Sequence, residues 1–155
     1  MNKEIQFLIS QLKDAHEGEP WFGRAATKLL SEVDEETAFQ KPASQHSILE
    51  LVWHMITWRE FAISRLQELP GKDMNYFEQN DWQKLDHSNL ALWKKGLNRL
   101  QETQNELIIL LENQEEVLLE KIVDERKYTF RKLLHGLIQH DIYHLGQIAY
   151  IKKMA

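Results

Sequence analysis

The feature that most constrains the fold is the scarcity of helix breakers around long stretches of helically spaced apolar residues. The 155-residue chain has six glycines and three prolines, and it is rich in Leu, Glu, Lys and Gln, which favour helix over strand. Apolar residues recur at helical spacing over about 3–33, 48–69, 88–112 and from 129 to near the C-terminus. These four stretches predict an all-α fold, a four-helix bundle formed by a single domain over residues 1–155.

Local signals predict where the first two helices begin and end. The segment Gly18-Glu19-Pro20 must bend or break the first helix, which is expected to resume from Trp21. Ser47 and Glu50 have the spacing of a capping box at the start of the second helix. Pro70-Gly71 is expected to end that helix near residue 69.

The connections limit the topology. Residues 72–87 are expected to be irregular, and they are long enough to travel the length of a helix, so the second and third helices can be parallel. The third helix is expected over 88–112. Residues 113–128 are consistent with a short strand or an extended crossing, and Thr129 can cap the fourth helix.

Composition excludes several classes of function. The chain has no cysteine, which excludes disulfides, zinc fingers, iron–sulfur clusters and a cysteine nucleophile. Its net charge of −5, with basic residues scattered among acids, argues against a nucleic-acid partner. The N-terminus lacks the apolar core of a signal peptide, and no apolar run reaches the length of a membrane span, so we expect a cytoplasmic protein without a membrane partner.

The most informative motif is a pair of histidines, His140 and His144. Residues four apart lie one turn above each other on a helix, so both imidazoles can reach one metal ion. Leu137 and Ile148 flank the pair on an apolar face, which predicts that it points into the bundle. The alternatives are two ordinary polar residues or a zincin-type protease, but Asp141 stands where the zincin base would be and no His, Asp or Glu follows His144.

A third ligand must therefore come from upstream, and His54 is the best candidate. It shares an apolar face of the second helix with Leu51, Trp58 and Phe61. Alone, it is consistent with a core histidine bonded to backbone or water; with the pair, it predicts a metal site between facing helices. The other histidines fit less well, although His46 can line a pocket if it is not simply solvated; they are His16, His46, His87 and His135.

Several neighbours are candidates for supporting roles. Gln147 and Tyr143 can contact the ligands or line a pocket; alternatively, Gln147 pairs with a neighbouring helix and Tyr143 packs at the surface or at a dimer contact. Trp58, one turn from His54, can line a pocket. We expect Gly136 and Gly146 to allow the close approach of another helix.

Three segments resemble the DinB-like proteins. Residues 134–148, with the run Tyr-His-Leu-Gly-Gln-Ile, resemble their C-terminal helix, residues 46–54 resemble their second helix, and residues 18–23 resemble an N-terminal feature of one branch. The resemblance implies a bundle with up-down-down-up topology, one zinc or nickel ion on His54, His140 and His144, and a homodimer. His46 departs from the pattern, since many relatives carry Trp there.

The resemblance also implies a function. Characterised relatives include thiol-dependent transferases and isomerases that use bacillithiol, mycothiol or glutathione. For this chain we expect a metal-dependent thiol S-transferase that acts on a small molecule with an external low-molecular-weight thiol. The alternatives are a metal-dependent hydrolase and a non-catalytic bundle with a structural metal or an interaction role. Because ligand histidines must be neutral, metal should be lost below about pH 6.

Overall fold

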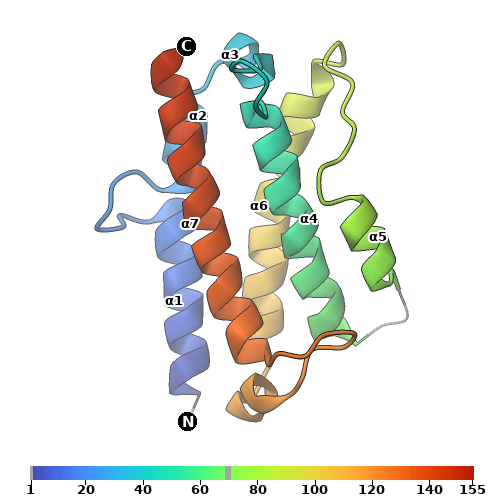
Figure 1. The fold of residues 1–155 in the computed structure, drawn as a ribbon. Helices are drawn as coiled ribbons and strands as arrows, with labels where there is room; N and C mark the ends of the chain where they lie inside the picture. Colours follow the sequence, from blue (N-terminus) through green and yellow to red (C-terminus); the bar gives the residue numbers. More distant parts are fainter. Residues whose placement is uncertain (1, 69–70) are drawn as a thin grey trace.

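The computed structural model describes residues 2–68 and 71–155, and over these residues the chain is all-helical, without strands. Four helices are long: α1 (Lys3–Glu17), α4 (Ile48–Gln67), α6 (Ala91–Glu112) and α7 (Phe130–Met154) (Figure 1). Four are short: α2 (Ala26–Ser31), α3 (Glu35–Phe39), α5 (Met74–Gln79) and the 3₁₀ helix η1 (Glu116–Glu120). No helix within the described residues is both long enough and apolar enough to cross a bilayer.

The long helices run in two parallel pairs. Arg131, at the start of α7, pairs with Glu4, at the start of α1, at 2.8 Å. The early part of α4 lies beside the early part of α6, where the Trp53 indole donates to the carbonyl of Leu92 at 3.2 Å. In Figure 1, α1 and α7 rise while α4 and α6 descend, and the chain between α4 and α6 climbs back along one side of the molecule.

The predicted caps of α4 and α7 are confirmed. The Ser47 hydroxyl accepts from the amide of Glu50 at 3.1 Å, and the Glu50 carboxylate accepts from the amide of Ser47 at 3.2 Å. Thr129 caps α7 by accepting from the amide of Lys132. The last helical residue of α4 is Gln67, followed by Glu68 in the left-handed region at φ 54°; Pro70, the predicted stop, lies outside the described residues.

The first helical region is shorter than predicted. Helix α1 ends at Glu17, and helix resumes only at Ala26, so the prediction that it resumes from Trp21 is wrong. The segment between them contains Pro20 and, at φ 143°, Gly23, and Trp21 is fully exposed there. Neither Pro20 nor Gly23 supports a continuous helix, because proline lacks an amide donor and a φ of 143° is far from the helical value.

Two connections also differ from prediction. Residues 72–87 are not wholly irregular, because they contain α5, which Asp73 caps and whose Phe77 is buried against Phe61. The third long helix begins at Ala91 rather than near residue 88. Residues 113–128 hold η1, followed by a single bridge between residues 122 and 129, and no strand.

The core has two parts, separated by polar side chains of α4 and α7. One part joins apolar residues of α1, the later turns of α4 and α6, and the early turns of α7. The other joins α2, the early turns of α4 and α6, and the later turns of α7. The buried polar residues of α4 and α7 at or near this boundary are His54, Thr57, Arg59, Asp141 and His144. Burying so many polar groups is costly unless each has a partner or a use.

Candidate metal centre

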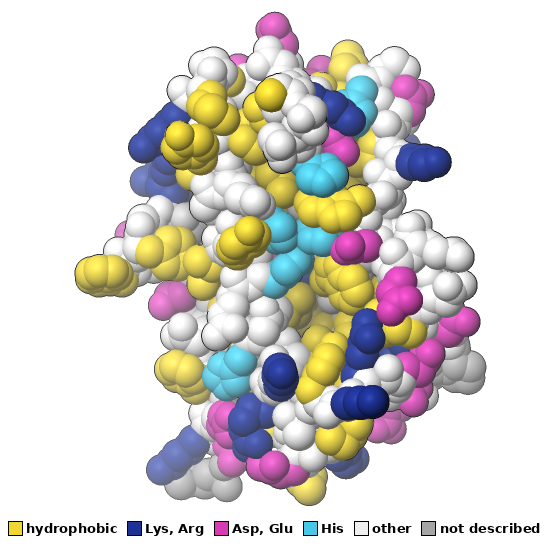
Figure 2. Space-filling view, in the orientation of Figure 1, with side chains coloured by type: hydrophobic (Ala, Val, Ile, Leu, Met, Phe, Trp, Pro, Cys, Tyr) yellow, Lys and Arg dark blue, Asp and Glu magenta, His cyan; other side chains and the backbone are white. Residues whose placement is uncertain are grey.

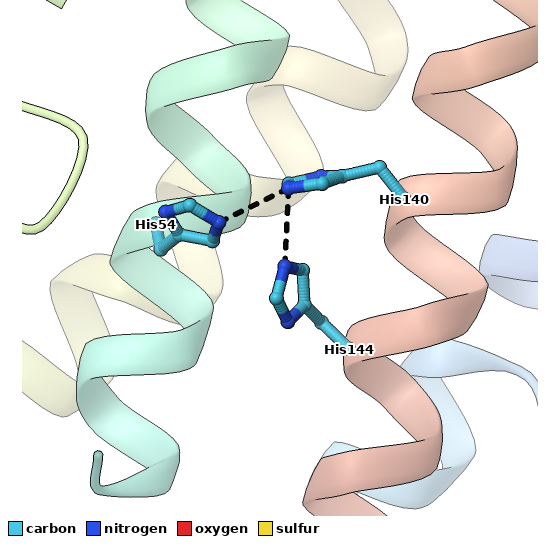
Figure 3. Close-up of side chains that lie close together, drawn as sticks. All are labelled: His54, His140 and His144. Atoms are coloured by element: carbon cyan, nitrogen blue, oxygen red, sulfur yellow. Dashed lines mark hydrogen bonds between the residues drawn. The ribbon is translucent and has the colours of Figure 1, made fainter. Parts of the chain in front are cut away.

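The structure brings His54, His140 and His144 together. His54 comes from α4, and the other two lie one turn apart on α7, so the cluster joins segments 86 residues apart in sequence. The Nε2 atom of His140 lies 3.0 Å from the Nε2 atom of His54 and 3.0 Å from that of His144 (Figure 3). The ligand atoms of all three rings lie within 4.8 Å of one another, so one ion can contact all of them.

Hydrogen bonds to groups outside the cluster indicate which ring nitrogen of His54 and of His144 carries the proton. The Nδ1 atom of His54 lies 2.7 Å from the carbonyl oxygen of Asp81, and that of His144 lies 2.6 Å from the side-chain oxygen of Gln147. Both partners accept hydrogen bonds, so each Nδ1 carries the proton and each Nε2 offers a lone pair. This outer support is typical of metal-ligating histidines.

The central ring, His140, makes the fit to a cation clear. Its Nε2 faces two lone pairs and can donate a proton to only one of them, while its Nδ1 is buried without a hydrogen-bond partner among the described residues. Zinc–nitrogen bonds of about 2.0–2.1 Å in tetrahedral geometry place ligand nitrogens about 3.3 Å apart, close to the spacing found here. A divalent ion would satisfy all three lone pairs at once.

The three rings are poised to be neutral. Burial lowers the pKa of His54 and His144 below the ordinary value. Burial, with a further contribution from the two neighbouring imidazoles, lowers the pKa of His140 from 6.5 to about 4. Neutral imidazoles are the form that binds metal.

Asp81 and Trp82, in the connection after α5, complete the wall around His54. Besides its carbonyl contact, Asp81 accepts a hydrogen bond from the indole of Trp58 at 2.7 Å. The Trp82 ring stacks on His54 at 3.8 Å between ring centres, and His46 stacks on the opposite face of Trp82 at 3.6 Å. Asp81 and Trp82 were not among the residues predicted from sequence; a tryptophan in a polar connection can indicate partial burial, but not which residue it packs against.

A buried ion pair lies beside the cluster. Arg59 of α4 donates from Nε and Nη2 to one carboxylate oxygen of Asp141 at 3.0 and 2.7 Å. Its remaining Nη1 donates to Gln104 of α6, whose amide donates in turn to the carbonyl of Leu12 in α1. Asp141 therefore joins the helices of the bundle and does not take the position of a zincin base.

Two apolar clefts open beside the cluster, along the face where Figure 2 shows histidine side chains grouped in a hollow. The wide cleft, of about 900 Å³, extends along the later turns of α7; it is lined by Pro42, Ala43, Gln45, His46, Leu51, Trp82, Tyr143, His144, Gly146, Gln147, Tyr150, Ile151 and Met154. The narrow cleft, of about 250 Å³, extends along the early turns; it is lined by Trp58, Phe61, Tyr128, Lys132, Leu133, Gly136, Leu137 and His140. One histidine of the cluster thus lines each cleft, His144 the wide one and His140 the narrow one.

The supporting residues predicted from sequence occupy distinct places. Gln147 contacts His144 and lines the wide cleft, where the largely exposed Tyr143 and His46 also lie. Trp58 lines the narrow cleft. The three remaining histidines lie outside the cluster and have other neighbours: His16 contacts Gln101, His87 contacts Ser47, and His135 lies near Glu4.

The fold and the site together define a class: an all-helical protein with three histidines from two long helices placed to hold a metal ion. The chain belongs to the DinB superfamily, whose family model matches residues 22–148. This confirms the resemblance found in the sequence. Comparison with curated proteins and with solved structures finds no match.

Proposed function

We propose that this protein is a metal-dependent thiol S-transferase, with one zinc or nickel ion on His54, His140 and His144 of an up-down-down-up bundle. The observation that supports it best is the convergence of three neutral Nε2 atoms beside apolar clefts. Such clefts, with few polar groups, suit a small molecule. The chain contains no cysteine, so the thiol must arrive as a cosubstrate.

The chemistry divides between the ion and the chain. A divalent ion held by the three neutral imidazoles would keep its double charge and would lower the pKa of a thiol or water bound to it. Asp81 and Gln147 hold two of the rings in the orientation that binding needs. In the transfer, the thiol releases its proton to solvent, its sulfur electron pair forms the new S–C bond, and the leaving group departs with the electrons of the broken bond.

The alternatives have weaker support. A hydrolase would gain from a carboxylate base, but Asp141 pairs with Arg59, and Asp81 faces the outer nitrogen of His54 and accepts from Trp58. A purely structural metal favours a closed set of four protein ligands. Among the described residues, the candidate cluster holds three histidines and no carboxylate.

Other expectations belong to the same proposal. The resemblance predicts a homodimer, and the composition predicts a cytoplasmic protein without a nucleic-acid partner. Light scattering on the purified protein would measure the mass of the assembly.

The first experiment is elemental analysis of the purified protein and of the His54→Ala variant. We expect about one zinc or nickel per chain in the wild type and loss of the metal in the variant, because two histidines bind a divalent ion far more weakly than three. His135→Ala is the matched control, since His135 also lies on α7 but outside the cluster. A wild type that stays metal-free after reconstitution would rule out the metal site.

A further inference from the structure

The two clefts lie on opposite sides of the histidine cluster along α7. The narrow cleft is lined by α7 residues from Leu133 to His140, and the wide cleft by residues from Tyr143 to Met154. Each contains one histidine of the cluster, His140 or His144. A ligand in either cleft can therefore approach the histidine cluster from its own side.

Glycines on α7 keep both clefts open. A Cβ atom built on Gly136, in the narrow cleft, or on Gly146, in the wide cleft, meets nothing within 4 Å. The expectation that these glycines allow the close approach of another helix is therefore wrong. Gly96 of α6 does serve that purpose, because a Cβ there would lie 3.0 Å from the Trp53 indole nitrogen. Glycine is unfavourable inside a helix, so the open space at Gly136 and Gly146 needs another explanation.

The clefts differ in charge. The lining of the wide cleft contains no Lys, Arg, Asp or Glu. The lining of the narrow cleft contains one cation, Lys132, whose ammonium lies 6.0 Å from the centre of the Tyr128 ring. Within the part of the chain that the structure describes, Lys132 forms no ion pair with a carboxylate. An anionic ligand group would supply that partner.

We propose that the two clefts are separate subsites for the two substrates of the transfer. The narrow cleft binds a thiol that carries a carboxylate, with its sulfur at the histidine cluster and its carboxylate at Lys132. The wide cleft binds the uncharged apolar body of the electrophile. This assignment rests on the proposed S-transferase function and names the class of substrate for each side of the site.

The geometry also sets the size of the thiol. Lys132 and His140 are eight residues apart on α7, which corresponds to about 12 Å along a helix. A thiol that reaches both needs a carboxylate several bonds from its sulfur, as in a small peptide. A two-carbon mercapto acid is too short, while a tripeptide has a suitable length.

The experiment fills one cleft at a time in the zinc-loaded protein. Binding of glutathione, a tripeptide thiol, is measured by titration calorimetry, and binding of the uncharged probe N-phenyl-1-naphthylamine by its fluorescence. We expect Gly136→Leu to weaken glutathione binding about tenfold or more and to leave the probe unaffected, because the new side chain occupies only the narrow cleft. Gly146→Leu should do the reverse. Gly136→Ala and Gly146→Ala, which add one methyl group to open space, provide the baseline.

A second comparison isolates the charge at Lys132. Lys132→Gln should weaken glutathione binding by about three- to tenfold and leave binding of the glycyl ethyl ester of glutathione unchanged, because the ester lacks the glycyl carboxylate that pairs with the ammonium, while the glutamyl carboxylate is offset by its own neighbouring amino group. Lys153→Gln, at an exposed site outside both clefts, is the control.

The outcomes separate the two proposals. Equal effects of both leucine variants on both ligands, in proteins that retain zinc, would overturn the division into subsites alone. Equal losses of glutathione and its ester in Lys132→Gln would overturn the contact between Lys132 and the glycyl carboxylate. A wild type without zinc would overturn the proposed function itself, and the metal content of every variant is therefore measured.

Discussion

At the scale of single residues, the three histidines are held unequally. His54 and His144 each have an acceptor at Nδ1, Asp81 and Gln147 respectively, whereas the Nδ1 atom of His140 has none among the described residues. The orientation of His140 therefore depends on packing and on its contacts with the other two rings. The Gln147 contact matters most on α7, because it fixes the proton on the outer nitrogen of His144 and frees the inner one.

We predict that Gln147→Ala weakens zinc affinity about tenfold, the lower end of the range for loss of an outer-shell partner. The variant loses the acceptor that orients His144, while all three ligands remain. Competition with a chromogenic chelator measures the affinity. Gln139→Ala, an exposed glutamine on the same helix, should bind zinc like the wild type; equal affinities of the two variants would contradict the role of Gln147.

The three histidines could be predicted because the spacing of His140 and His144, and the apolar faces of the helices that carry all three, can be recognised in the sequence alone. It did not predict Asp81, Trp82 or the partner of Asp141. Asp81 and Trp82 lie in a connection without periodicity, so nothing local indicates that they turn back to His54. The Arg59 pairing depends on how α4 and α7 face each other, which a single sequence does not encode locally.

At the scale of elements, α4 and α7 are joined by the buried Arg59–Asp141 pair as well as by the histidines. Both side chains are buried, and one carboxylate oxygen of Asp141 has no partner among the described residues. A buried pair is not strongly stabilising as a whole, but removing one member leaves an uncompensated charge.

We predict that Arg59→Ala lowers the free energy of unfolding by about 3–5 kcal/mol, because Asp141 is then buried without its partner. Urea unfolding of the metal-free protein measures the change. The double variant Arg59→Met, Asp141→Leu should recover most of the loss. For comparison, Arg99→Ala removes only partly exposed pairs and should cost at most about 1 kcal/mol. A loss in Arg59→Ala no larger than that in Arg99→Ala would contradict the prediction.

The long helices were predictable where strong caps coincide with long periodicity, as at Ser47 and Thr129. Of the short helices, α2 falls within the predicted first region, whereas α3, α5 and η1 were not predicted. Helices α3 and α5 have five and six residues, too few for a clear 3.6-residue pattern, and burial of Ala38 and Phe77 against the bundle supports them. Such helices depend on tertiary packing more than on their own propensity.

At the scale of the whole molecule, a bound ion would tie α4 to α7 and so stabilise the fold. The stability of the metal-free fold also depends on pH. The unfolded chain binds protons at its histidines near pH 6.5, whereas burial lowers the pKa of His140 in the folded chain to about 4. As pH falls from about 6.5 towards 4, the unfolded state takes up protons first, and the stability of the folded state decreases.

We predict that zinc at about a thousand times its dissociation constant raises the melting temperature by about 10 °C at pH 7.5, since such saturation contributes about 4 kcal/mol. The gain should disappear below about pH 6, where protons compete for the ligands. Differential scanning calorimetry measures both. His54→Ala should show no gain at either pH and His135→Ala the full gain; a gain that persists at pH 4 would argue against histidine ligands.

The separation of the ligands along the chain has a consequence for biosynthesis. His140 lies 86 residues after His54, so a growing chain that has emerged only as far as α6 presents a single histidine of the cluster. An ion bound by all three histidines could therefore be captured only after the ribosome has released α7. Loading would follow translation of the domain, and the metal acquired would reflect the ions available in the cell at that moment as much as the intrinsic preference of the site.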